Sequence, residues 1–209
     1  MKKIKLVAVV GLVLIMITGG SALAGKNGQG NVSGQQALSQ AEKEALIFSR
    51  EEEKLARDVY LFLFDVWGQW IFENIAASEQ QHMDAVKNLL DKYNLDDPAE
   101  GQAEGEFNNT DLQNLYDILT GRGTESKLQA LDVGATIEDL DIFDLQNLLE
   151  LTDKADITRV FENLIKGSRN HLRAFVGQLE LLGETYEAQY LEQNEVDEIV
   201  NSERETGRY

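Results

Sequence analysis

The chain has two histidines, and the surroundings of His82 suggest chemistry most clearly. His82 follows Glu79 with the spacing Glu-x-x-His. On a helix, residues three positions apart lie on one face, so this carboxylate and imidazole can converge on a single ion. Both residues interrupt an otherwise apolar row, and a buried carboxylate is costly without a partner. The pattern therefore predicts a pair of metal ligands, with a chance occurrence on a helix surface as the alternative.

The second histidine, His171, lies in a weaker copy of this pattern, in which Ser168 occupies the position of the glutamate. Farther upstream, Glu138 and Asp141 lie about one helical turn apart. If the chain turns near Asp153, then Glu138 and Ser168 are each about fifteen residues, or about 22 Å of helix, from that turn. The acids and His171 would then lie at compatible levels of a bundle. They either bind metal there, or the histidines are core residues bonded to Asp or Ser.

Three consecutive acids, Glu51, Glu52 and Glu53, offer a further carboxylate. Glu52 follows Ser49 with the spacing of a capping box. Acids in a first helical turn are also favoured by the helix dipole. The residue types alone therefore leave open which of the three is a ligand, and whether any of them is.

Apolar rows with helical periodicity predict four long helices that would carry these residues. No useful length of sequence alternates with period two, so no sheet is expected. Two helix hairpins joined by a polar crossover predict an all-α four-helix bundle. The expected helices run from between residues 36 and 49 to Trp67, from the turn at 67–70 to Tyr93, from an N-cap near Thr136 to Leu151, and from Asp156 to Leu182.

Shorter segments complete this architecture. Residues 94–109 form the expected crossover, and a short helix is expected over about 111–121, with another turn or two at 126–131. The segment after Leu182 is expected to pack back on the bundle as a short helix. These segments make the expected fold a four-helix bundle with extra short helices.

The N-terminus has the features of an export signal. Three lysines precede an apolar run at residues 6–17, and Ala22-Leu23-Ala24 supplies a small-x-small cleavage pattern. We therefore expect an extracellular or periplasmic protein with no stable membrane anchor after cleavage; an uncleaved anchor is the alternative. The expected divisions are a signal peptide at 1–24, a flexible tether at 25–36, the helical domain at 37–200 and a polar tail at 201–209.

Composition excludes several classes of partner and site. The net charge of −18 over 209 residues repels phosphate backbones and argues against nucleic-acid binding. The absence of cysteine excludes iron–sulfur clusters and thiolate metal sites. Any redox cycle would therefore need an external reductant. The sequence leaves a homo-oligomer open.

Longer motifs resemble known families. The segment REEEKLARDVY and the later EQQH resemble the first half of rubrerythrin and other ferritin-like di-iron proteins. Together with GATIEDLDIFDL, GSRNHLRAF and YEAQYL, they are closer still to the uncharacterised prokaryotic family named domain of unknown function 2202, placed in the ferritin-like superfamily. This resemblance covers about residues 49–200. It implies the following metal ligands: Glu53, Glu79, His82, Glu138 and His171, with Asp141 as a further candidate.

The resemblance also implies a function. Two iron or two manganese ions would serve an oxidoreductase that acts on oxygen or peroxide. Ser168 departs from the pattern, so the second ion loses a carboxylate unless Asp141 replaces it. Three Glu and two His could also bind zinc. The alternatives are a metal-binding or storage protein without turnover, and a helical interaction module whose metal site has degenerated.

Overall fold

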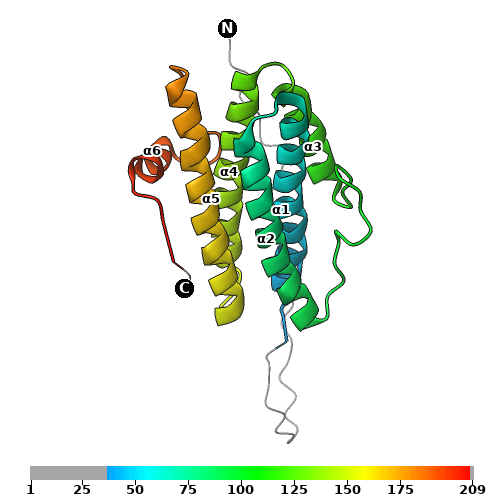
Figure 1. Ribbon diagram of the computed structural model, residues 1–209. Helices are drawn as coiled ribbons and strands as arrows, with labels where there is room; N and C mark the ends of the chain where they lie inside the picture. The colour runs from blue at the N-terminus through cyan, green and yellow to red at the C-terminus, as the bar shows by residue number, and fades with distance from the viewer. Residues whose placement is uncertain (1–36, 208–209) are drawn as a thin grey trace, which may run out of the picture.

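Six α-helices and no β-strand make up residues 37–207, the part of the chain that the computed structural model describes. The protein is therefore all-α, as predicted. The expected signal peptide and tether lie outside the described residues. Four long helices lie side by side, and two shorter ones flank them (Figure 1). The long helices are α1 (Gln40–Trp67), α2 (Trp70–Tyr93), α4 (Lys127–Leu149) and α5 (Ala155–Leu181); the shorter are α3 (Thr110–Gly123) and α6 (Gln193–Asn201).

The four long helices pair as two antiparallel hairpins. The most extensive packing joins α1 to α2 and α4 to α5, while α1 also contacts α4 and α2 also contacts α5. Buried apolar side chains from all four helices form one core, which includes Val59, Phe72, Ile142 and Phe175. Near the end of α1, Leu63 is fully buried whereas Val66 is 42% exposed. The space between the two hairpins is where the polar side chains described below meet.

The start of α1 lies ten residues before the predicted capping box. Ser39 is the N-cap; its side chain accepts a hydrogen bond from the Glu42 backbone N–H, and Glu42 accepts one in return from the Ser39 backbone N–H. The start at Gln40 lies within the predicted range of residues 36–49, and the cap is at Ser39 rather than at Ser49, where the spacing also suited one. Ser49 and Glu52 lie inside the helix and are buried. The carboxylate of Glu52 is therefore not used to accept a backbone hydrogen bond at the N-terminus of the helix.

Helix α4 also begins earlier than predicted. Its N-cap is Ser126, whose side chain accepts a hydrogen bond from the Gln129 backbone N–H. Thr136, the predicted N-cap, lies inside the helix and donates its hydroxyl to the carbonyl of Asp132. The short turn expected at 126–131 and the helix expected from residue 136 are thus one continuous helix.

Buried polar contacts fix the crossover between α2 and α3. Lys54 of α1 is buried and contacts Asp58 at 2.5 Å, and it donates to the carbonyls of Ala103 and Glu106. The backbone N–H of Gly105 donates to Asp58 at 2.9 Å. The crossover is therefore attached to α1 along its length rather than looped away from it.

The C-terminal segment packs back on the bundle, as predicted. Helix α6 contacts α5 and buries Val196 and Ile199. Asp139 of α4 accepts hydrogen bonds from the Tyr186 hydroxyl and from the backbone N–H groups of residues 189–191. Beyond α6, Glu205 pairs with Arg169 at 2.5 Å. Within residues 37–207, no helix is long and apolar enough to cross a membrane.

Candidate metal centre

The predicted ligands come from four different helices and face the interior between the two hairpins. Glu53 lies on α1, Glu79 and His82 on α2, Glu138 on α4 and His171 on α5. The three glutamates are almost completely buried. The side chain of His82 is 12% exposed and that of His171 is 11% exposed. Each of these residues lies on a helix that packs extensively against its hairpin partner.

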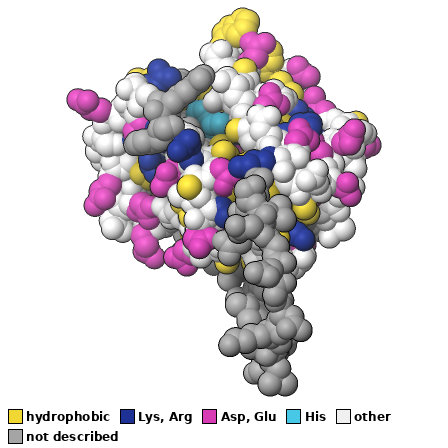
Figure 2. Space-filling view, turned by 90° about the horizontal axis from the view of Figure 1, so that it is seen from below, with side chains coloured by type: hydrophobic (Ala, Val, Ile, Leu, Met, Phe, Trp, Pro, Cys, Tyr) yellow, Lys and Arg dark blue, Asp and Glu magenta, His cyan; other side chains and the backbone are white. Residues whose placement is uncertain are grey.

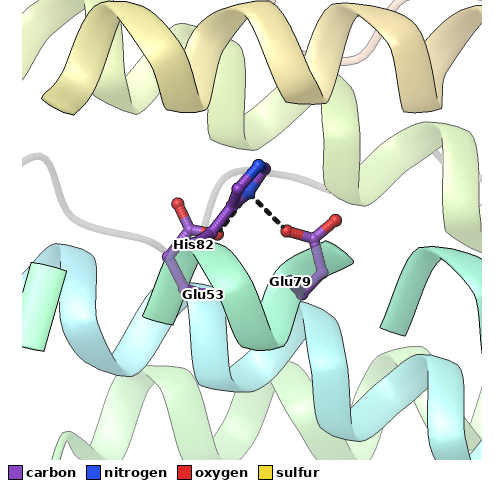
Figure 3. Close-up of side chains that lie close together, drawn as sticks. All are labelled: Glu53, Glu79 and His82. Atoms are coloured by element: carbon purple, nitrogen blue, oxygen red, sulfur yellow. Dashed lines mark hydrogen bonds and ion pairs between the residues drawn. The ribbon is translucent and has the colours of Figure 1, made fainter. Parts of the chain in front are cut away.

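The first group of ligands contains Glu53, Glu79 and His82 (Figure 3). His82 Nδ1 lies 2.7 Å from Glu79 Oε2 and 3.1 Å from Glu53 Oε2. These potential ligand atoms all lie within 4.8 Å of one another. The structure thus brings Glu53, rather than Glu52, to His82, and settles which of the neighbouring acids of α1 joins this group.

The second group contains Glu79, Glu138 and His171. His171 Nδ1 lies 2.7 Å from Glu79 Oε1 and 3.4 Å from Glu138 Oε2. Glu79 therefore belongs to both groups and offers a different oxygen to each. The imidazole rings of His82 and His171 stack with their centroids 5.6 Å apart. The two groups form one continuous cluster joined by a single carboxylate.

Two residues that the sequence analysis did not single out orient the imidazoles. Ser78 Oγ lies 3.0 Å from His171 Nε2, so a proton on Nε2 leaves the lone pair on Nδ1 facing the carboxylates. Gly167 of α5 lies against His82, because a Cβ added there would be 2.4 Å from His82 Nε2. Neither role could be identified from one helix alone, since each contact joins α2 to α5.

Tyr60 is a further residue whose role the sequence analysis missed. Its hydroxyl is buried and donates to Glu138 Oε1 at 2.5 Å. It lies seven residues after Glu53, which is two helical turns along the same face of α1. This spacing was the available signal, although an aromatic residue on an inner face is usually a packing residue.

Asp141 and Ser168 lie beside the cluster, outside both groups. The Ser168 hydroxyl lies against Asp141 Oδ2 and also 3.0 Å from the carbonyl of Leu164. Burial, followed by the negative charges of Glu53 and Glu138, raises the pKa of Asp141 well above its ordinary value. The serine thus contacts the very carboxylate that could compensate for the missing glutamate.

The cluster has unusual proton affinities. Burial lowers the pKa of His171, but the attraction of Glu79 and Glu138 outweighs this and raises it to about 10. Burial raises the pKa of Glu53 to about 7, against the opposing attraction of His82. For Glu79, the attraction of both histidines outweighs burial and holds the pKa well below its ordinary range. Without metal, the cluster therefore keeps protons on its histidines, and these are the protons that a bound cation would displace.

Several polar atoms of the cluster are available to a metal ion. Glu53 Oε1, Glu79 Oε1 and His171 Nδ1 are buried and make no hydrogen bond. Glu79 Oε1 and His171 Nδ1 nevertheless lie only 2.7 Å apart, so they are close but not aligned. Ligands about 2.0–2.1 Å from one ion are separated from each other by about 3 Å. The donor atoms therefore have the spacing of neighbouring ligands around an ion.

A groove between α2 and α5 reaches this cluster from the surface. Its volume is about 1010 Å³, and its lining includes His171, Ser78, Asn74, Asn170 and Arg204. None of its lining residues is an Asp or Glu, although the chain has 37 of them. A histidine is also visible at the molecular surface in Figure 2, with Lys and Arg side chains nearby. The cluster is thus buried but lies close to solvent.

Comparisons with known proteins agree with this architecture. Residues 42–203 match the family model described as Uncharacterized protein domain (DUF2202). Uncharacterized protein MJ0754 of Methanocaldococcus jannaschii is 54% identical over 173 residues, which cover 83% of this chain and 94% of that protein. A crystal structure of hypothetical protein MJ0754 from Methanococcus jannaschii matches with a TM-score of 0.80 at 53% identity, covering 82% of this chain and 98% of that one. These names state no activity.

Proposed function

The chain belongs to the DUF2202 family, and we propose that it is a ferritin-like protein that binds two metal ions between its hairpins. Glu79 would be the ligand shared by the two ions, because it belongs to both groups. Glu53 and His82 complete the first ion's ligands, and Glu138 and His171 complete those of the second. The observation that carries this proposal is the position of Glu79, whose two oxygens each lie 2.7 Å from a different histidine nitrogen.

The donor set favours iron or manganese. Imidazole and carboxylate ligands together suit both metals, and zinc is the further candidate. Ligands projecting inward from four helices, with one Glu-x-x-His, follow the arrangement of ferritin-like carboxylate proteins. Ser168 replaces the glutamate of the second such motif, and its neighbour Asp141 is the carboxylate available in its place.

The groove favours an oxidoreductase that acts on dioxygen or peroxide. A bound redox-active pair would supply the electrons for reducing such an oxidant. The groove, with a volume of about 1010 Å³, is large enough to admit a small oxidant to Ser78 and His171. His171 and Glu138 belong to the same ligand group. The Tyr60 hydroxyl donates a hydrogen bond to Glu138 and so fixes the position of that carboxylate. Because the chain has no cysteine, the reductant must be another molecule.

Metal binding without turnover is the second candidate function. The replacement of a glutamate by Ser168 favours it, since fewer carboxylates would then hold the second ion. We also propose that the protein is exported and acts outside the cytoplasm, on the basis of the signal-like pattern in residues 1–24.

Elemental analysis of the purified protein tests the shared ligand. Cells supplied with iron, manganese and zinc together should yield protein in which about two ions per chain depend on the histidine cluster, that is, are lost in the His82→Ala/His171→Ala variant. Glu53→Gln or Glu138→Gln should each remove about one ion, whereas Glu79→Gln should remove both, because only Glu79 belongs to both groups.

The control is Glu73→Gln, an acid of α2 outside the cluster, which should retain both ions. A folded wild-type protein without metal, even after reconstitution, would contradict the proposal. So would a Glu79→Gln variant that keeps both ions. Peroxide or oxygen consumption with an added reductant then separates turnover from simple binding.

A further inference from the structure

Most buried acids of residues 37–207 outside the histidine cluster have clear partners. Asp58 pairs with Lys54 and Arg57. Glu51 accepts hydrogen bonds from the backbone N–H groups of residues 108 and 109. Glu52 differs: it is only 4% exposed, and the side chain that it meets as a hydrogen-bonding partner is another acid, Asp144. Two buried acids that face each other must either share a proton or hold a cation between them, because two unneutralised buried charges are costly.

The surroundings of Glu52 contain further oxygens in the same condition. Asp144 and then Asp141, which lie one turn apart on α4, are the acids whose charges act most strongly on Glu52. Asp144 Oδ2 is buried, and the side-chain partner of Asp144 is Glu52 itself. Ser49, one turn before Glu52 on the same face of α1, is fully buried and its hydroxyl makes no hydrogen bond. Apart from the contact between the two acids, four buried atoms have no hydrogen-bonding partner: Ser49 Oγ, Glu52 Oε1, Glu52 Oε2 and Asp144 Oδ2.

We propose that Glu52 and Asp144 form a third cation site, at the interface of α1 and α4, that takes a hard divalent ion such as Mg²⁺ or Mn²⁺. The site goes beyond the dinuclear centre, because neither residue belongs to the two histidine groups. Ser49 supplies a further oxygen from the same face of α1.

The chemistry of the donors selects this class of ion. All the donors are oxygens, which hard cations prefer, and no imidazole is present to favour zinc or copper. Calcium takes six to eight oxygens at about 2.3–2.6 Å, usually from many protein groups. Magnesium and manganese are held by one or two carboxylates together with water. Asp144 is only partly buried, so its side of the site can admit both the ion and its water.

Two carboxyl groups can also satisfy each other by sharing a proton, and this is the competing explanation. A shared proton engages one oxygen from each residue and leaves the second Glu52 oxygen unpartnered. A divalent ion instead offsets both negative charges and can contact every orphaned oxygen. The number of bound cations distinguishes the two explanations directly.

Binding of Mn²⁺, followed by electron paramagnetic resonance and by elemental analysis, tests the site. In the His82→Ala/His171→Ala variant, which lacks the dinuclear centre, about one Mn²⁺ per chain should remain, and excess Mg²⁺ should displace it. Adding Glu52→Gln and Asp144→Asn should abolish this ion. In the wild-type background, the same two substitutions should remove one ion and leave those that depend on the histidines.

The matched control is Asp65→Asn with Glu150→Gln, which removes two exposed acids, one in α1 and one at the C-cap of α4, and should leave the count unchanged. Circular dichroism checks folding, and Asp144→Asn alone serves as a milder variant at a partly exposed position. The proposal is overturned if the double histidine variant binds no Mn²⁺, or if the Glu52 and Asp144 substitutions leave the count unchanged. These measurements do not depend on the histidines. A negative result would therefore contradict the third site and leave the dinuclear proposal unaffected.

Discussion

The carboxylate of Glu79 is held between two imidazoles, and this position explains the proton affinities around it. Each Glu79 oxygen faces the Nδ1 atom of a different histidine. In the absence of metal, protons on the histidines are the charges that balance the buried carboxylates. A divalent ion can take over this role only by displacing those protons. Stability and metal affinity should therefore depend on pH in opposite directions.

The metal-free protein should become less stable as the pH rises from about 5 to 10. The folded-state pKa of Glu53 is about 7, above its ordinary 4.5, and that of His171 is about 10, above its ordinary 6.5. A raised pKa means that the folded state holds the proton more tightly, so this stabilisation is present below the unfolded pKa and lost as the pH passes the folded one. Glu79, whose pKa is lowered, acts in the opposite sense only as the pH falls below 4.5.

Urea unfolding of metal-free protein at several pH values measures this dependence. His171→Ala should reduce the slope between pH 7 and 10 without abolishing it. Burial lowers the pKa of His82, but the attraction of Glu79 and Glu53 outweighs this and raises that pKa, too, well above its ordinary value. Metal affinity should instead rise with pH over the same window, because the ligands must lose their protons. A free energy of unfolding that is constant from pH 5 to 10 would show that the histidines are not held protonated.

The site could be predicted from sequence where its geometry follows one helix. Glu79 and His82 are three residues apart, and that spacing alone puts them on one face. Ser78 and Tyr60 could not be assigned in this way, because their contacts are to His171 and Glu138 on other helices. The residue types left open the choice between Glu52 and Glu53, and the local spacing of Glu52 from Ser49 could not resolve it, because the helix begins ten residues earlier.

At the scale of the helices, the periodic apolar rows predicted the ends of α1 and α2 and the extent of α5. They did not predict the start of α4. Thr136 can cap a helix or bond to a carbonyl four residues back within one, and local sequence does not distinguish these roles. Gly134, also within α4, allows the ring of Phe175 to approach, since an added Cβ would lie 2.4 Å from that ring. Contacts of this kind between α4 and α5 cannot be read from the local sequence, and they help to determine that the helix continues through residues 134–136.

The close approach of α5 to α2 depends on Gly167. Gly167→Ala places a Cβ 2.4 Å from His82 Nε2, so either the imidazole or the helix must move. We expect loss of the ion held by the His82 group and destabilisation of about 1–3 kcal/mol, typical of overpacking. Thermal unfolding and elemental analysis of the variant measure both effects.

Gly177→Ala provides the control on the same helix. No atom lies within 4 Å of the Cβ that this substitution would add. Replacing a helical glycine by alanine should then stabilise the protein by about 0.5–1 kcal/mol and leave metal binding unchanged. If Gly167→Ala behaves like Gly177→Ala, the contact between α5 and His82 does not position the histidine.

At the scale of the whole molecule, the two ligand groups differ in which parts of the chain they join. The first group lies entirely within the hairpin of α1 and α2. The second group joins the hairpins, because Glu79 comes from α2 whereas Glu138 and His171 come from α4 and α5. Packing between the hairpins is less extensive than packing within them. An ion bound by the second group would therefore link the two hairpins across the interface with the less extensive packing.

Metal should accordingly protect the interface between the hairpins through the second group. An ion present at about 100 times its Kd stabilises the native state by about 2.7 kcal/mol, or about 5–10 °C in Tm for a chain of this size. If the hairpins separate while each stays helical, the first group can keep its ion but the second cannot. His171→Ala should therefore abolish most of the metal-induced slowing of hydrogen exchange where α1 faces α4 and α2 faces α5, whereas His82→Ala should preserve much of it. Equal losses in the two variants would mean that the hairpins open only when the whole molecule unfolds.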